Sequence, residues 1–161
     1  MKTLHLSDTH GAHHRLHNLP EADVVVHSGD FTMTGSESEA IDFLNWFCEL
    51  PHKHKIFICC NHDACLYRAN IEGLDTDVLI THSPAYGILD FDDNINYGSP
   101  ELLAKLPSLN LKTHLFGHIH AQHGIVEKNG TIFSNGAIMN ADYSNLQPPN
   151  QIEILSLFDF E

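Results

Sequence analysis

The feature that most constrains this fold is a series of five short apolar segments, each followed by Asp, Asn or His. The pairs are residues 2–6 before Asp8, 23–27 before Asp30, 55–60 before Asn61, 77–80 before His82, and 113–116 before His118. Segments of this length and composition are typical of buried strands. In open α/β sheets the ligand site lies beyond the carboxyl ends of the strands. We therefore expect these five clusters, which are distant in sequence, to meet at one rim.

Two stretches between the apolar segments have the pattern of helices. Ser36 and Glu39 form a capping box that predicts a helix continuing to about Leu50. Ser99 and Pro100 predict a second, short helix, because proline suits the first helical position. The chain thus alternates strands with helices over its first two thirds.

The remaining third of the sequence has the pattern of strands alone. Candidate strands cover residues 124–127, 131–134 and 152–157, and Asn129-Gly130 is a hairpin-turn pair. A chain of 161 residues is long enough for one domain with a real core and leaves little room for a second. We expect one domain over residues 1–161.

The charge of the chain limits its partners. With 8 basic and 21 acidic residues, the formal net charge is −13. Such a surface would repel a long nucleic acid, whose phosphates are usually contacted by Lys and Arg. Arg15 and Arg68 are the only arginines, so a bound phosphate would need another source of positive charge. Metal cations would supply it, and the 14 histidines make metal binding a reasonable hypothesis.

The sequence also predicts a cytoplasmic location and no membrane partner. No apolar run approaches the roughly 20 residues needed to span a bilayer. The first residues enter a strand pattern at once, without the pattern of a signal segment. Cys59 and Cys60 are adjacent and would face opposite sides of a strand. We interpret all four cysteines as reduced.

The polar clusters contain the residue types of a metal centre, although each one is weak evidence alone. Their sequences are Asp8-Thr9-His10, Gly29-Asp30, Asn61-His62-Asp63, Thr81-His82-Ser83 and Gly117-His118-Ile119-His120. Carboxylate, amide and imidazole groups are all metal ligands, and a carboxylate can also orient a neighbouring imidazole. The recurrence of such groups after strand upon strand is a much stronger signal than any single motif.

In this order the motifs resemble those of the calcineurin-like metallophosphoesterase family. The resemblance extends from residue 3 to about residue 157. Residues 81–90 (THSPAYGILD) and 114–124 (HLFGHIHAQHG) are similar to the small metallophosphoesterase-domain phosphodiesterases of the brain type. The resemblance to this family implies an α/β fold with two mixed β-sheets between outer helices. This is a four-layer αββα sandwich in a compact version.

The resemblance also implies a centre that holds two metal ions. Its ligands would be Asp8, His10 and His120 for the first ion, Asp30 as a bridge, and Asn61, His82 and His118 for the second. Mixed oxygen and nitrogen ligands suit transition metals, with Mn²⁺ expected first and Fe, Ni, Co or Zn as alternatives. Two such ions share a hydroxide and hold the phosphoryl oxygens for in-line attack.

In the same resemblance His62 is the histidine that does not bind metal. It would act as general acid or phosphate donor, oriented by Asp63, and would bind substrate together with Asn61. The chain departs from the family at Cys60, where glycine is usual. Glycine permits unusual dihedral angles, so Asn61 is the ligand most affected by this change.

The expected function is hydrolysis of small phosphodiesters, cyclic nucleotides among them. The alternatives are a phosphomonoesterase or protein phosphatase, and a non-catalytic protein-interaction module on the same scaffold. Asp63 and Thr81 lie only 18 positions apart, which leaves no room for a large cap over the site. The sequence allows a homodimer that covers this open site.

Several other polar residues have simpler interpretations. We expect His5 and His27 to be packed in strands, and His13 and His14 to lie on a solvated helix face. Asp90, Asp92 and Asp93 form an acidic run typical of a solvated loop. Asn135 is positioned to support the rim. Tyr86, Tyr97 and Tyr143 could stack on a nucleobase, although such residues more often pack within the protein.

Overall fold

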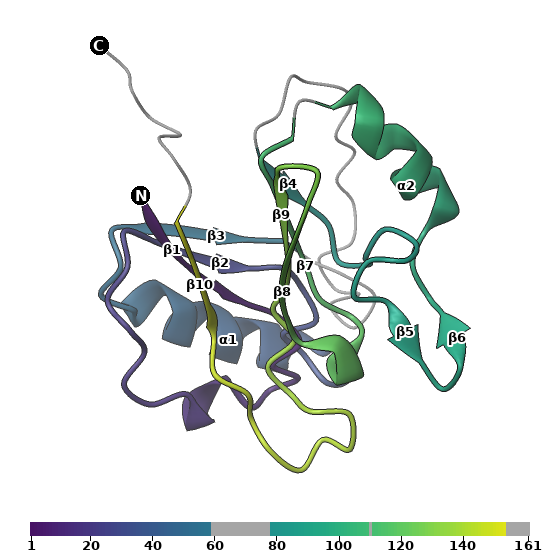
Figure 1. The fold of residues 1–161 in the computed structure, drawn as a ribbon. Helices are drawn as coiled ribbons and strands as arrows, with labels where there is room; N and C mark the ends of the chain where they lie inside the picture. Colours follow the sequence, from purple (N-terminus) through teal and green to yellow (C-terminus); the bar gives the residue numbers. More distant parts are fainter. Residues whose placement is uncertain (59–77, 110, 154–161) are drawn as a thin grey trace.

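The computed structural model describes residues 1–58, 78–109 and 111–153, which form two four-stranded sheets (Figure 1). The first sheet has the order β10 (Asn150–Glu153), β1 (Lys2–Leu6), β2 (Val24–His27), β3 (His54–Phe57). The second has the order β4 (Val78–Ile80), β7 (Thr113–Phe116), β9 (Thr131–Asn135), β8 (Gly124–Lys128). Three strands of each sheet are parallel, while β10 and β8 are antiparallel edge strands. Both sheets are therefore mixed, as predicted.

In the described part of the chain, two α-helices and three short 3-10 helices accompany the sheets. They are α1 (Glu37–Glu49), α2 (Pro100–Lys105), η1 (His13–Arg15), η3 (Leu106–Ser108) and η4 (His120–Gln122). The predicted capping box starts α1: Ser36 Oγ accepts a hydrogen bond from the Glu39 N–H, and the Glu39 carboxylate accepts one from the Ser36 N–H. Ser99 likewise caps α2. Both predicted helices are thus confirmed.

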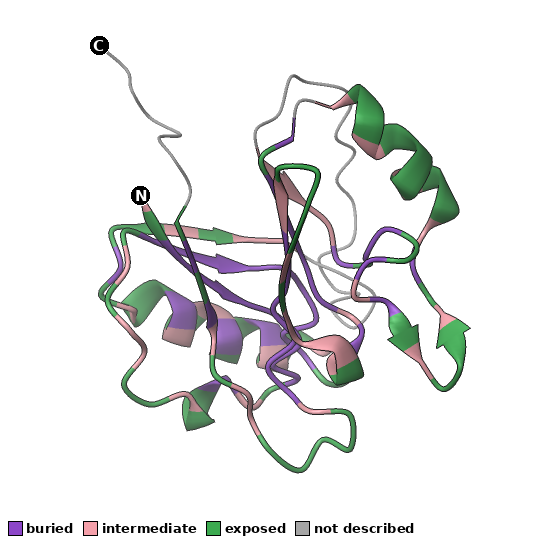
Figure 2. Ribbon diagram, viewed as in Figure 1, coloured by how far each residue is buried: buried purple, intermediate pink, exposed green. Residues whose placement is uncertain are grey.

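Three hydrophobic clusters show how the layers stack. One cluster joins Leu4 and Val25 of the first sheet to Phe43 and Phe47 of α1. The second lies between the sheets, and the third lies where Leu102 of α2 packs on the far side of the second sheet. The order is therefore helix, sheet, sheet, helix, with the most buried strands in the middle (Figure 2). The predicted four-layer fold is confirmed.

The ends of several strands differ from the sequence prediction. Strand β3 ends at Phe57, earlier than predicted, and residues 59 and 60 lie outside the described part of the chain. Strand β10 begins at Asn150, two residues before its predicted start. Its ladder with β1 includes the pair His5–Asn150, so pairing in the sheet sets this boundary.

A short hairpin replaces the predicted acidic loop. Strands β5 (Phe91–Asp92) and β6 (Ile95–Asn96) pair around Asp93 and Asn94, both of which have positive φ. Asp and Asn tolerate this left-handed conformation better than most residues, so the run forms a tight turn.

Asp90, at the base of this hairpin, was expected in solvent and is instead buried. Its Oδ2 accepts hydrogen bonds from the Gly87 and Gly98 N–H groups, at 2.9 and 3.0 Å. The prediction of solvent exposure was wrong because this carboxylate satisfies backbone donors that would otherwise be orphaned.

For the histidines outside the strand-end motifs, the structure confirms some of the sequence predictions and corrects others. His5 and His27 are fully buried in strands, as expected. His14 is exposed as expected, but His13 is only 1% exposed, so its predicted solvation was wrong. The 3-10 helix η1 turns His13 toward α1, a contact between elements that local sequence does not indicate.

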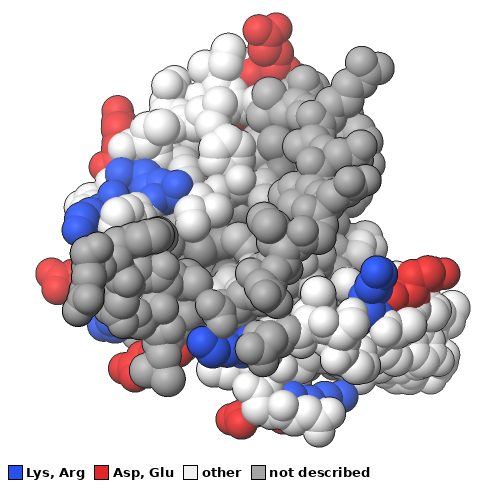
Figure 3. All heavy atoms as spheres, turned by 90° about the horizontal axis from the view of Figure 1, so that it is seen from above, with Lys and Arg blue, Asp and Glu red and all other residues white. Residues whose placement is uncertain are grey.

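Charged side chains lie scattered over the surface (Figure 3). On the face drawn there, the described Lys and Arg residues alternate with acidic ones. Cys48 carries a free thiol, and the other three cysteines lie outside the described residues. Among the described helices, none has the length and apolar character that a bilayer crossing requires.

Candidate metal centre

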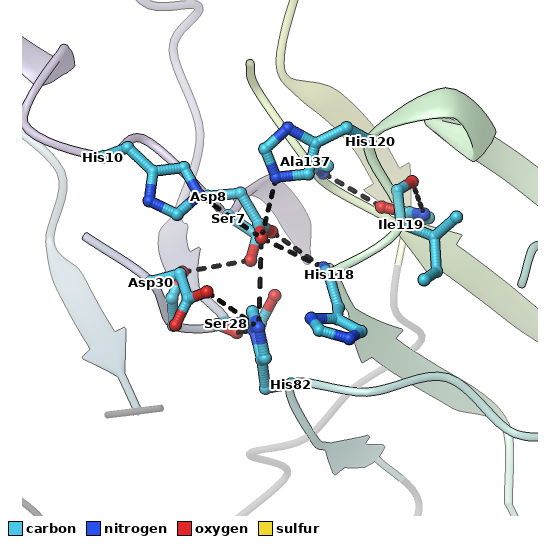
Figure 4. Close-up of polar contacts among 12 residues, drawn as sticks. Ser7, Asp8, His10, Ser28, Asp30, His82, His118, Ile119, His120 and Ala137 are labelled. Carbon is cyan, nitrogen blue, oxygen red and sulfur yellow. Dashed lines mark hydrogen bonds and ion pairs between the residues drawn. The ribbon is translucent and has the colours of Figure 1, made fainter. Parts of the chain in front are cut away.

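Six of the seven predicted metal ligands meet at one rim of the molecule (Figure 4). Their ligand atoms form two groups, each within 4.8 Å: Asp8 with His10 and His120, and Asp30 with His82 and His118. These residues follow β1, β2, β4 and β7, so the carboxyl ends of parallel strands from both sheets meet here. The predicted residues Asn61, His62 and Asp63 lie outside the described part of the chain.

Two buried carboxylates face the imidazole rings across the centre. His120 Nε2 lies 3.4 Å from Asp8 Oδ1, and His82 Nε2 lies 3.1 Å from Asp30 Oδ2. His82 Nε2 is also 3.9 Å from Asp8 Oδ1, so Asp8 faces both groups. The two groups are therefore adjacent parts of one site.

The orientation of three imidazoles is set by backbone carbonyl groups. Nδ1 of His10, His82 and His120 lies 3.2, 3.2 and 3.4 Å from the carbonyl oxygens of Thr32, Ser28 and Asn140, respectively. A carbonyl oxygen can only accept, so Nδ1 must carry the proton in each ring. Nε2 is then the basic nitrogen and is turned toward the carboxylates, the arrangement expected of imidazoles that bind a metal.

Four of the predicted ligands have a left-handed backbone. Asp8, His10, Asp30 and His118 have φ values of 50°, 42°, 55° and 72°. This conformation is uncommon for residues other than glycine and persists only where the surroundings hold it. Here hydrogen bonds do so: the Asp8 N–H donates to the Gly29 carbonyl at 2.9 Å, and the His10 N–H donates to the Asp30 carbonyl at 3.1 Å.

The electrostatics of the centre keep Asp8 ionised. Burial alone would raise the pKa of Asp8, but the hydrogen bond from His120 and the neighbouring His82 hold it well below its usual value. The His118 N–H also donates to both Asp8 carboxylate oxygens, at 3.1 and 3.0 Å. An ionised carboxylate in this position is an anionic ligand that is available without prior deprotonation.

The histidines of the centre differ in how the site shifts their pKa. Burial lowers the pKa of His10 and His118, which favours the neutral ring that binds metal. Burial acts in the same direction on His120, but the hydrogen bond and charge of Asp8 outweigh it and raise the pKa of that ring. A cation at this position would take the place of the proton that His120 Nε2 gains when the ring becomes charged.

Asn135 and Gly117 help to position the turn that carries His118 and His120. Asn135 is fully buried; its Nδ2 donates to the Ile119 carbonyl at 2.8 Å, and its Oδ1 accepts from the Ala137 N–H at 3.1 Å. The predicted support from Asn135 is thus seen in the structure. Gly117 packs directly against Asp8, a role that the sequence did not reveal.

One tyrosine lies against the centre. The ring centroid of Tyr143 is 5.4 Å from that of His10 and 4.8 Å from that of His120. The side chain remains partly open to solvent, with 45% of the residue exposed. Burial and the charges of Asp8 and Asp30 raise its pKa, so the phenol stays protonated. Of the three tyrosines that could contact a ligand, Tyr143 is the one whose ring contacts these histidines.

The donor set fits two divalent transition-metal ions. Each group offers one carboxylate and two imidazoles, and the Nδ1 contacts show that three of these rings are already oriented for binding. Imidazole and carboxylate together favour metals such as Mn, Fe, Co, Ni and Zn over Ca or Mg.

Comparisons with known proteins agree with this site. Residues 1–74 match the family described as calcineurin-like phosphoesterase. A UPF0046 protein of Caenorhabditis elegans is 28% identical over 207 aligned positions, which cover 87% of this chain and 70% of that protein. Human metallophosphoesterase domain-containing protein 1 is 23% identical, covering 92% of this chain and 69% of that protein. The chain is thus similar to the calcineurin-like phosphoesterase family, whose model matches its residues 1–74.

This similarity supports a metal-dependent phosphoesterase, and a solved structure supports the fold. The structure of vacuolar protein sorting 29 from Cryptosporidium parvum matches with a TM-score of 0.51 and 15% identity. The match covers 89% of this chain and 79% of that one. At this identity the likeness shows the fold alone.

This chain is shorter than these two similar proteins within the aligned region. The alignments to the two relatives run over 207 and 227 positions, although this chain has only 161 residues. Those proteins therefore carry residues within the domain that this chain lacks. The difference agrees with the compact version of the fold that the sequence predicts.

Proposed function

We propose that this chain is a metal-dependent phosphodiesterase that hydrolyses small phosphodiesters, cyclic nucleotides among them. The observation that carries the proposal is the pairing of two ligand groups at one rim, each with one carboxylate and two imidazoles. The match of residues 1–74 to the calcineurin-like phosphoesterase family supports phosphoester hydrolysis in general. The diester preference rests on the resemblance of residues 81–90 and 114–124 to the brain-type metallophosphoesterase-domain phosphodiesterases.

In this proposal each ligand group holds one cation. Asp8, His10 and His120 would hold the first, and Asp30, His82 and His118 would hold the second. The resemblance adds Asn61 to the second set and makes Asp30 a ligand of both ions. Bound there, Mn²⁺ or a similar ion would lower the pKa of water and neutralise the phosphoryl oxygens. The carbonyl contacts that fix the Nδ1 protons keep the ligand nitrogens aimed at the site without further rearrangement.

His62 is the proposed proton donor, with Asp63 holding its ring in position. It would protonate the leaving oxygen, a step that general acids accelerate by roughly 10²–10⁴-fold. Tyr143 borders the His10 and His120 rings and is exposed enough to contact a substrate, so it is a candidate wall for an aryl or nucleobase group.

The charge of the chain favours a small diester over other phosphoesters. Monoester specialists bind a dianionic end, for which arginine is the usual donor, yet Arg15 and Arg68 are the only two. Arg15 lies exposed in η1. A net charge of −13 also disfavours long nucleic acids as substrates. The alternatives are a phosphomonoesterase or protein phosphatase, and a non-catalytic interaction module.

The proposal is tested by elemental analysis of the purified chain together with assays on bis-aryl and mono-aryl phosphates with Mn²⁺. We expect about two transition-metal ions per chain to resist dialysis, as two-metal sites require, and diesters to be cleaved. Asp30→Ala should lose both the bound metal and the turnover. His62→Ala should keep the metal and lose roughly 10²-fold or more in turnover.

His17→Ala is the matched control, because His17 is an exposed histidine outside the centre. It should behave as the unaltered protein in both measurements. Cleavage of monoesters without any cleavage of diesters would refute the diester preference. Less than one tightly bound ion and no turnover on either substrate would support the interaction module instead.

A further inference from the structure

Outside the predicted centre, one more group of side chains among the described residues has the chemistry of a metal site. It consists of His13 and His14 in η1 and Asp42 on α1, and their ligand atoms all lie within 4.8 Å of one another. The two elements are in contact, with η1 packed beside α1 (Figure 1). The cluster thus joins two segments that are distant in sequence.

His13 is the unusual member of this cluster. It is 1% exposed, and neither of its ring nitrogens makes a hydrogen bond within the part of the chain that the structure describes. Its ring packs on Phe43 and Trp46, with centroid distances of 5.5 and 5.1 Å. Buried polar atoms without partners are rare in native proteins and call for an explanation such as an ion.

The position of Asp42 offers that explanation. Asp42 Oδ2 lies 3.2 Å from His13 Nε2, yet the two atoms are misaligned for a hydrogen bond. Two ligands of one Zn²⁺ ion, each about 2.0–2.2 Å from the metal, stand roughly 3–3.5 Å apart. Neither ligand then points at the other, because both point at the ion. The His13–Asp42 geometry has both properties.

His14 supplies the third ligand. Its Nε2 lies 3.0 Å from both Asp42 carboxylate oxygens and donates a hydrogen bond to them. Its side chain is 57% exposed and that of Asp42 is 55% exposed, so a cation can reach the cluster from solvent. Without a metal ion, the Asp42 carboxylate accepts this hydrogen bond from His14.

The protonation states also suit a cation. Burial, with a contribution from His14, lowers the pKa of His13, so its ring is neutral at pH 7. The hydrogen bond from His14 lowers the pKa of Asp42, which keeps the carboxylate ionised. Metals bind the deprotonated forms of both groups.

We propose that His13, His14 and Asp42 form a metal site separate from the predicted two-metal centre. Two imidazoles and one carboxylate suit Zn²⁺ or a similar divalent transition metal, with water completing the coordination. The bound ion would fasten η1, which begins three residues after His10, to the side of α1. The site stands on its own geometry and does not depend on the proposed phosphodiesterase activity.

Trp46 provides a reporter for this site. It is the only tryptophan of the chain, and its ring centroid is 5.1 Å from that of His13. Cu²⁺ titrated into the full-length chain should quench its fluorescence. In His14→Gln and Asp42→Asn, the Cu²⁺ concentration that gives half-quenching should rise at least roughly ten-fold, the size of change that altered metal-site residues produce. Because both residues are exposed, these variants should fold.

Equilibrium dialysis against Zn²⁺ gives the second measurement. The unaltered chain should bind one more ion than Asp42→Asn, and the same difference should persist in an Asp30→Ala background, where the two-metal centre is impaired. His17→Gln, which changes an exposed histidine close to η1 in sequence, should match the unaltered chain in both assays.

Two results would overturn the proposal. Equal quenching and equal Zn²⁺ stoichiometry in the unaltered chain, His14→Gln and Asp42→Asn would reduce the cluster to a hydrogen-bonded pair. An equal loss in His17→Gln would show that surface histidines bind the metal without a defined site. Failure of phosphodiester hydrolysis alone would leave both measurements, and therefore this site, unaffected.

Discussion

At the scale of single residues, the candidate centre depends on a glycine that binds nothing itself. A Cβ atom at Gly117 would overlap Asp8 Oδ2 and Ser7 Oγ. The Gly117 N–H also donates to the His82 carbonyl at 2.9 Å, so this backbone lies against both ligand groups. Glycine is required here for close approach, and its replacement must move a predicted ligand.

We predict that Gly117→Ala displaces Asp8 and lowers the tightly bound metal from about two ions to about one, because two-metal sites need both ligand sets intact. Elemental analysis after dialysis measures the change. Gly98→Ala is the matched control, since a Cβ there would lie 2.6 Å from backbone atoms of Ala85 and Tyr86 and would touch no predicted ligand. Equal metal loss in both variants would point to general unfolding and against a local effect on Asp8.

At the scale of elements, α1 starts at a network centred on Glu39. The Glu39 carboxylate accepts hydrogen bonds from Ser36 and from the Thr34 hydroxyl and N–H. These bonds, with that of the Thr34 hydroxyl foremost, lower the pKa of Glu39 to about 2. Phe43 and Phe47 of the helix then pack on the first sheet, so the cap stabilises one whole layer.

We predict that Ser36→Ala lowers the free energy of unfolding by about 1 kcal/mol, because the Glu39 N–H loses its acceptor. The midpoint of urea unfolding at pH 7 reports the loss. Ser36→Thr should retain most of the stability, since threonine is also an N-cap residue and keeps the hydroxyl that donates to Glu39. The capping role would be contradicted if alanine and threonine destabilised the protein equally.

At the scale of the whole molecule, three buried histidines make stability depend on pH. His5, His27 and His114 lie in strands, and burial lowers the pKa of each from 6.5 to about 3. Below pH 6.5 the unfolded chain binds protons at these rings while the folded chain does not. The stability contributed by the neutral rings is therefore complete above pH 6.5 and is lost as the pH falls from 6.5 toward 3.

We predict that the free energy of unfolding falls by about 1.4 kcal/mol per pH unit for each of these histidines as the pH approaches 5. Together they give a slope of about 4 kcal/mol per unit. Urea unfolding at pH 7, 6 and 5 with a chelator measures it. His114→Gln should reduce the slope by about one third, because one such group is removed. A stability that does not change between pH 7 and 5 would refute this account.

The sequence by itself determined much of the fold and indicated which residues form the candidate metal centre. Strand β1 and strand β7 have the predicted bounds, and the cap of α1 is the predicted one. These features depend on periodicity, capping and turn chemistry, which are local properties of the chain. Residues that end neighbouring parallel strands of one sheet lie at the same edge, which brings Asp8 near Asp30 and His82 near His118. The roles of Asn61, His62 and Asp63 remain predictions.

Only the tertiary structure decided how buried and how oriented the polar residues are. His13 and Asp90 looked solvated in sequence, but η1 packs on α1, and the hairpin closes over the carboxylate. The left-handed conformations of Asp8 and Asp30 depend on hydrogen bonds between neighbouring strand ends. The proposed metal site of His13, His14 and Asp42 likewise joins two elements, η1 and α1. Burial, backbone strain and ligand convergence arise from contacts between distant segments, and local sequence carries no direct record of those contacts.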